Sequence, residues 1–140
     1  MRVLRREGID VLVSMLTSAE SEELGLLEER AACHQAGIEF VSFPIADREV
    51  PGSFVALQQL VTQLRQKLRS GKSIGAHCRA GIGRSSLLLA AILCAEGLSA
   101  TAAFALISEA RGLQVPDTSE QVQWIEGFKN SLPKEGIVVT

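Results

Sequence analysis

Apolar residues recur along this chain with two different spacings. Segment 9–16 is a short apolar run rich in β-branched residues, which is typical of a buried strand. Segment 54–69 has apolar residues at positions 54, 57, 60, 61, 64 and 68, the three-to-four spacing of an amphipathic helix. The two patterns alternate along the sequence.

Turn residues separate these segments. Predicted strands cover 9–16, 38–43 and 72–76. Predicted helices cover 18–37, 54–69, 84–96, 99–110 with Ser99 as N-cap, and 117–131, while 46–53 is a loop. This alternation predicts an α/β fold, a central mostly parallel sheet flanked by helices. No repeat, low-complexity tract or linker interrupts it, so residues 1–140 are expected to form a single domain.

Composition narrows the choice of partners. The 140 residues include 14 Lys and Arg against 16 Asp and Glu, a net charge of −2, so no nucleic-acid partner is expected. The basic stretch 65–72 is interpreted as a solvated helix end, with a binding role as the alternative. No apolar run is long enough to span a bilayer and no signal segment opens the chain, so no membrane contact is expected and we predict a cytoplasmic location. Three cysteines are an odd number, which favours free thiols.

Segment 77–85, His-Cys-Arg-Ala-Gly-Ile-Gly-Arg-Ser, carries the clearest chemical signal. It lies between a predicted strand and a predicted helix, where backbone N–H groups and the positive end of the helix favour anions and thiolates. Gly81 and Gly83 permit the concave turn, and Arg84 can hold two phosphate oxygens. We therefore predict a phosphate cradle with Cys78 as nucleophile, and phosphate-ester hydrolysis. The structural alternative is a turn with a buried cysteine.

The Cys-x5-Arg-Ser spacing, with His77 before the cysteine, resembles the signature of the protein tyrosine phosphatase superfamily, and in particular its compact atypical dual-specificity and kinase-associated-phosphatase-like group. The resemblance implies a cysteinyl-phosphate intermediate, with Ser85 steadying the departing thiolate. It implies that His77 orients Cys78 by donating to nearby backbone. No metal or other cofactor is implied. The implied phosphate-binding residues are Arg79, Ala80, Gly81, Ile82, Gly83 and Arg84.

Two further segments fit the same resemblance. Segment 44–51 looks like the acid loop of this group, with an aspartate four residues before a proline, which makes Asp47 the general acid. Glu49 is the alternative acid, and a turn role is the alternative for Asp47. Segment 115–121 looks like the family's Pro-x-Thr-x-x-Gln, which makes Gln121 the residue that places the hydrolytic water. A solvent-facing helix glutamine is the alternative, and Asp117 is interpreted as a helix cap.

The chain departs from the family pattern in two places. Few residues precede segment 9–16, so either the chain is trimmed or the family's N-terminal strand or hairpin is missing, and this strand is then expected near a sheet edge. The chain has no tyrosine, which favours a shallow pocket without a tyrosine-bearing wall. We therefore predict a protein phosphatase acting on phosphotyrosine and on phosphoserine or phosphothreonine. The alternatives are a phosphoinositide, nucleotide or RNA 5′ phosphatase, and a non-catalytic phosphopeptide-binding module.

Other candidate residues are assigned to packing. Cys33 is expected to be partly buried beside a surface His34, and Cys94 is expected in the core. No metal site is predicted, because the cysteines and histidines lack paired ligand spacing. Trp124 and Phe128, four residues apart, are predicted core anchors.

Overall fold

The computed structural model describes residues 8–45, 53–78, 83–112 and 119–132. Within these ranges the sheet has the strands β1 (Val11–Ser14), β2 (Glu39–Ser42) and β3 (Ile74–His77) in the order β2-β1-β3. Both neighbouring pairs are parallel. The predicted α/β fold with a parallel sheet is confirmed, with strand ends that differ from prediction by one or two residues.

Strand β1 is central to this sheet. All four of its residues are buried, whereas β2 has exposed residues at both ends. The expectation that segment 9–16 lies near a sheet edge is therefore wrong: β2 pairs with one side of β1 and β3 with the other. In this register Ser14 lies opposite both Ser42 and His77, so the carboxyl ends of the strands meet at one edge.

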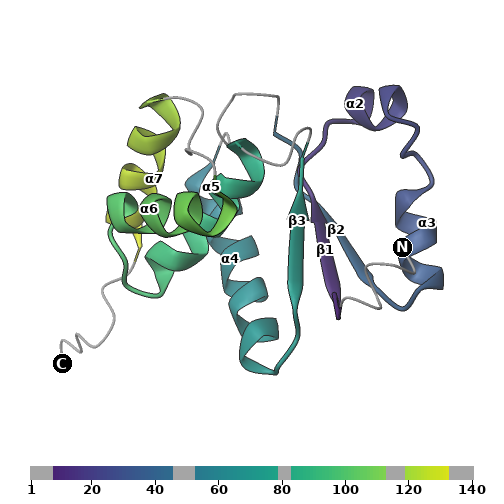
Figure 1. Ribbon diagram of the computed structural model, residues 1–140, viewed down its shortest axis with the longest axis horizontal. Helices are drawn as coiled ribbons and strands as arrows, with labels where there is room; N and C mark the ends of the chain where they lie inside the picture. Colours follow the sequence, from purple (N-terminus) through teal and green to yellow (C-terminus); the bar gives the residue numbers. More distant parts are fainter. Residues whose placement is uncertain (1–7, 46–52, 79–82, 113–118, 133–140) are drawn as a thin grey trace.

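Helices cover both faces of the sheet (Figure 1). One face carries α2 (Ser18–Glu23) and α3 (Glu29–Gln35), and the other carries α4, α5, α6 and α7. The bounds of the latter four are Phe54–Arg69, Gly83–Ala95, Ala100–Arg111 and Ser119–Ser131. The main core lies on that second face, and a smaller cluster of Leu12, Cys33 and Ile38 lies beneath α3.

The single helix predicted over 18–37 is in fact two helices. Helix α2 ends at Glu23, and Gly25 adopts the left-handed φ of 69° that glycine tolerates best. Helix α3 starts only at Glu29. The acidic, helix-favouring composition of this segment concealed the break, because Gly25 was outweighed by its neighbours.

The remaining helices agree closely with the sequence pattern. Helix α4 has the predicted bounds, and Ser99 caps α6 by accepting from the amide of Ala102 at 3.1 Å. The aromatic anchors are confirmed: Phe128 is fully buried, and the Trp124 ring stacks on it at 6.0 Å between centroids. No helix in the described ranges has the length and apolarity that a bilayer crossing requires.

Candidate active site

The cysteine of the motif sits where strand β3 gives way to helix α5. Cys78 directly follows β3, is buried, and its Sγ lies 3.7 Å from Ser85 Oγ on the first turn of α5. Gly83 opens that helix, as a loop-to-helix phosphate cradle requires. The loop residues Arg79, Ala80, Gly81 and Ile82 lie outside the described residues. The strand–loop–helix context predicted for the motif is thus present on both sides of the loop.

Arg84 is held firmly in the interior. Its side chain is 1% exposed, and Nη1 and Nη2 donate to the two carboxylate oxygens of Glu20 at 2.6 and 2.8 Å. Nη1 also donates to the carbonyl oxygen of Ile45 at 2.7 Å. This two-pronged contact fixes the plane of the guanidinium, which is the group expected to grip phosphate oxygens.

Glu20 joins Arg84 to the start of helix α2. Its Oε1 accepts from the amide and the hydroxyl of Thr17, both at 3.1 Å, and Thr17 Oγ1 accepts from the Glu20 amide. These bonds form a capping box. Hydrogen bonding to Arg84 is the main cause that lowers the pKa of Glu20 to about 2, against the opposing effect of burial. Glu20 is therefore a carboxylate at any physiological pH.

His77 contacts a second glutamate. Its Nε2 lies 2.9 Å from Oε2 of Glu29, which is buried at the start of α3. The described partner of His77 Nε2 is thus a carboxylate. That His77 orients Cys78 by donating to nearby backbone stays a prediction. The pair ties α3 to the strand that carries Cys78.

Comparisons with known proteins agree with this geometry. A family model described as "Polymorphic toxin system, DSP-PTPase phosphatase" matches residues 1–98. The chain belongs to this DSP-PTPase phosphatase family. It is 34% identical over 111 residues to protein tyrosine phosphatase PRL-1 of Leishmania major, covering 74% of this chain and 62% of the relative. The chain thus spans less than two thirds of that relative's length.

Solved structures of phosphatases share the fold. A kinase associated phosphatase superposes with a TM-score of 0.81 at 23% identity, covering 91% of this chain and 72% of the other. Tk-PTP in its active form gives 0.82 at 24% identity, covering 94% and 84%. The compact phosphatase fold expected from the motif is therefore confirmed.

A described residue just before the proposed acid of this DSP-PTPase member contacts Arg84. Asp47 and the alternative Glu49 lie outside the described residues. Ile45, two residues before Asp47, donates its amide to the Met15 carbonyl at 3.1 Å and accepts from Arg84 through its own carbonyl.

Gln121 is fully buried on α7, which packs against α5. The alternative of a solvent-facing glutamine is therefore wrong. Its role in placing water stays a prediction, and Asp117 lies outside the described residues. A buried carboxamide requires hydrogen-bond partners inside the protein, and such partners would hold the Gln121 side chain in one position.

The other cysteines are packing residues. Cys94 is buried as predicted, while Cys33 is fully buried rather than partly so, beside an exposed His34. Burial raises the pKa of both thiols. In the described part of the chain, no three His, Cys, Asp or Glu side chains gather as metal ligands.

Sequence reasoning missed Glu20 and Glu29. A Thr-x-x-Glu capping signal at 17–20 was available in the sequence. It marks a helix start, however, and carries no information about an arginine 64 residues away. Nothing in the local sequence distinguishes Glu29 from its acidic neighbours.

Proposed function

We propose that this chain is a protein phosphatase that hydrolyses phosphotyrosine, and phosphoserine or phosphothreonine, through a cysteinyl-phosphate intermediate. The observation that supports the proposal is the position of Cys78 and Arg84 on the two sides of the motif loop. The cysteine directly follows strand β3, and the arginine, buried and bound by Glu20, occupies the first turn of helix α5. The kinase associated phosphatase with the same fold is described as carrying a substitution of its catalytic-site cysteine to serine, which supports the same role for Cys78.

In the first step, the Cys78 thiolate attacks phosphorus. An S–P bond forms, the bond from phosphorus to the ester oxygen breaks, and Asp47 gives its proton to that leaving oxygen. The amides of 79–83 and the start of α5 stabilise the charge on the transferring phosphoryl group, together with Arg84. The clamp by Glu20 means that the guanidinium needs little reorganisation when the phosphoryl group arrives.

In the second step, water cleaves the intermediate. Asp47, now a carboxylate, takes a proton from a water that Gln121 places, the new P–O bond forms and the S–P bond breaks. Ser85 lies 3.7 Å from the sulfur and donates its hydroxyl hydrogen to the departing thiolate. Inorganic phosphate and the free enzyme result.

The loop composition favours a protein substrate over a polyphosphorylated lipid. Arg79 is the only basic residue of 78–85 besides Arg84. A phosphoinositide would present additional phosphates that a second or third basic side chain would normally meet. A structurally similar protein, PTPMT1, has been solved with PI(5)P at 20% identity to this chain, which makes that lipid a useful comparison substrate.

The test is hydrolysis of p-nitrophenyl phosphate with a chelator present, followed by phosphotyrosine and phosphothreonine peptides, PI(5)P and a nucleotide. We expect turnover of the aryl phosphate and the phosphotyrosine peptide, and its loss in Cys78→Ser. Tight phosphopeptide binding without turnover would instead identify a binding module, and a preference for PI(5)P or the nucleotide would refute the protein substrate.

The acid assignment has its own pair of variants. Asp47→Ala should lower kcat by about 10²-fold or more with little change in binding, because proton donation to the leaving oxygen is lost. Glu49→Ala, two residues away, is the matched control. Full activity in Asp47→Ala together with its loss in Glu49→Ala would transfer the role to Glu49.

A further inference from the structure

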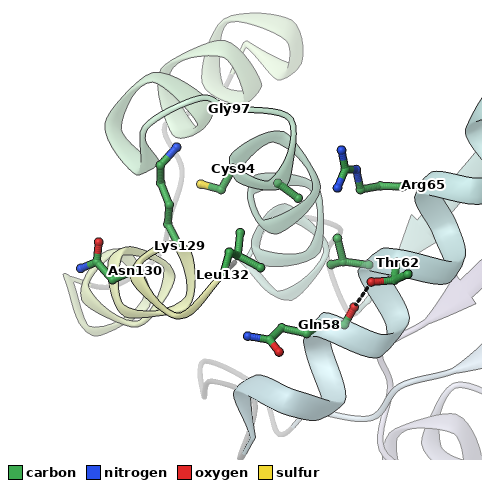
Figure 2. Close-up of a pocket in the computed structure, with 10 residues that line it drawn as sticks. Gln58, Thr62, Arg65, Cys94, Gly97, Lys129, Asn130 and Leu132 are labelled. Atoms are coloured by element: carbon green, nitrogen blue, oxygen red, sulfur yellow. Dashed lines mark hydrogen bonds between the residues drawn. The ribbon is translucent and has the colours of Figure 1, made fainter. Parts of the chain in front are cut away.

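A cavity lies against the C-terminal end of helix α5, away from the end that carries Arg84 (Figure 2). Arg84 stands on the first turn of α5 and Cys94 on its last, which separates them by about 15 Å at 1.5 Å per residue. The cavity has a volume of about 590 Å³, inside the range of about 300–1,000 Å³ typical of small-ligand sites. It therefore has the size of a ligand site and is separate from the candidate active site.

Three helices form its walls. Figure 2 shows Gln58, Thr62 and Arg65 on α4 at one side, Lys129 and Asn130 on α7 at the other, and the end of α5 between the two helices. Its apolar lining comes from Val61, Ala95, Leu132 and the side chain of Cys94. Burial raises the pKa of the Cys94 thiol, although Lys129 opposes that effect, so the sulfur adds no negative charge to the lining.

The charged groups on the lining are both cationic. Arg65 and Lys129 are present, and the ten lining residues include no aspartate or glutamate. Glu96, just outside, accepts from Arg65 Nε at 2.8 Å and neutralises one of the two charges. The Lys129 ammonium donates to the Leu98 carbonyl, which holds it at the rim and uses only one of its three N–H groups. The net charge offered to a ligand is thus one positive charge beside an apolar surface.

We propose that this cavity binds a small amphipathic monoanion, an aromatic or short aliphatic carboxylate or sulfonate. The apolar body would cover Val61, Ala95 and Leu132, and the anionic group would meet Lys129. Inorganic phosphate, with two charges and no apolar part, suits the phosphate loop better than this surface. Ligand binding at this cavity is measured directly and does not depend on phosphatase activity.

The probe is 8-anilino-1-naphthalenesulfonate, titrated by fluorescence and by calorimetry into the folded full chain and into Cys78→Ser. We expect saturable binding of one probe per chain, unchanged by excess inorganic phosphate. Lys129→Gln should weaken it about fivefold through loss of a charge-assisted hydrogen bond. Lys67→Gln removes the same charge from an ion pair with Glu39 outside the cavity, and it should leave the affinity unchanged.

A second variant guards against a general effect of charge. Ala95→Phe fills the cavity and should abolish saturable binding while circular dichroism and the melting temperature show a folded protein. No saturable binding to the wild-type chain would overturn the proposal. Displacement of the probe by phosphate would also overturn it. So would wild-type affinity for the probe in Lys129→Gln or in Ala95→Phe. Binding that appears only after residues 133–140 are removed would also overturn it, because that segment would then be the occupant.

Discussion

Two arginine–glutamate pairs in this molecule share one chemistry and differ in their surroundings. Arg84 and Glu20 are 1% and 10% exposed and meet through both guanidinium Nη atoms. Arg65 and Glu96 are 15% and 48% exposed, and Arg65 Nε lies 2.8 Å from Glu96 Oε1. Hydrogen bonding to the arginine lowers the pKa of both glutamates, and the pKa of Glu20 falls to about 2.

The difference teaches what burial does to an ion pair. A solvent-exposed pair contributes about 0–1 kcal/mol, because water solvates either partner when the other is removed. A buried partner left alone has no such replacement, and breaking the pair costs about 3–5 kcal/mol. The contact between Arg84 and Glu20 is therefore expected to set both the position of the phosphate-binding group and the stability of the domain.

The largest contrast should appear in catalysis. Arg84→Lys should lower kcat/KM for p-nitrophenyl phosphate by about 10³-fold, because a lysine cannot reproduce the planar two-donor contact with phosphoryl oxygens. Arg65→Lys should change it less than about twofold, which steady-state kinetics on the two purified variants will measure. Comparable losses in both would mean that the buried pair has no special role in turnover.

Stability should separate the two glutamates. Glu20→Ala leaves the Arg84 guanidinium buried without its carboxylate and should lower the free energy of unfolding by about 3 kcal/mol. Glu96→Ala should lower it by about 0.5 kcal/mol. Urea unfolding followed by circular dichroism gives both values. A loss in Glu96→Ala as large as that in Glu20→Ala would contradict the argument from burial.

Acid should weaken the same pair in a defined pH window. The pKa of Glu20 is about 2 in the folded protein and near 4.5 when unfolded, so its contribution is complete above pH 4.5 and is lost as pH falls toward 2. A shift of that size corresponds to about 3 kcal/mol. The difference in unfolding free energy between wild type and Glu20→Gln, whose side chain does not titrate, should therefore shrink from pH 5 to pH 4 and pH 3. A difference that stays constant with pH would argue against a lowered pKa of Glu20.

Sequence reasoning located the parts of the site that are local in the chain. Cys78, Ser85 and Arg84 lie within eight residues, and the strand and helix around them follow from apolar spacing. The residues that orient Arg84 and His77 come from helices 64 and 48 positions away, where a local pattern carries no information. The exposed-edge prediction for β1 failed for a related reason, since strand order depends on pairing between distant segments.

Helix α2 has only six residues, too few to persist in isolation, and its opening turn is closed by the carboxylate that also grips Arg84. We expect an oxyanion that docks on the guanidinium to restrain Glu20 and, through it, the Thr17 backbone N–H that donates to Glu20 Oε1. Deuterium uptake at that single amide should slow when phosphate or vanadate is added. The start of α2 is thus expected to report occupancy of the proposed phosphate site.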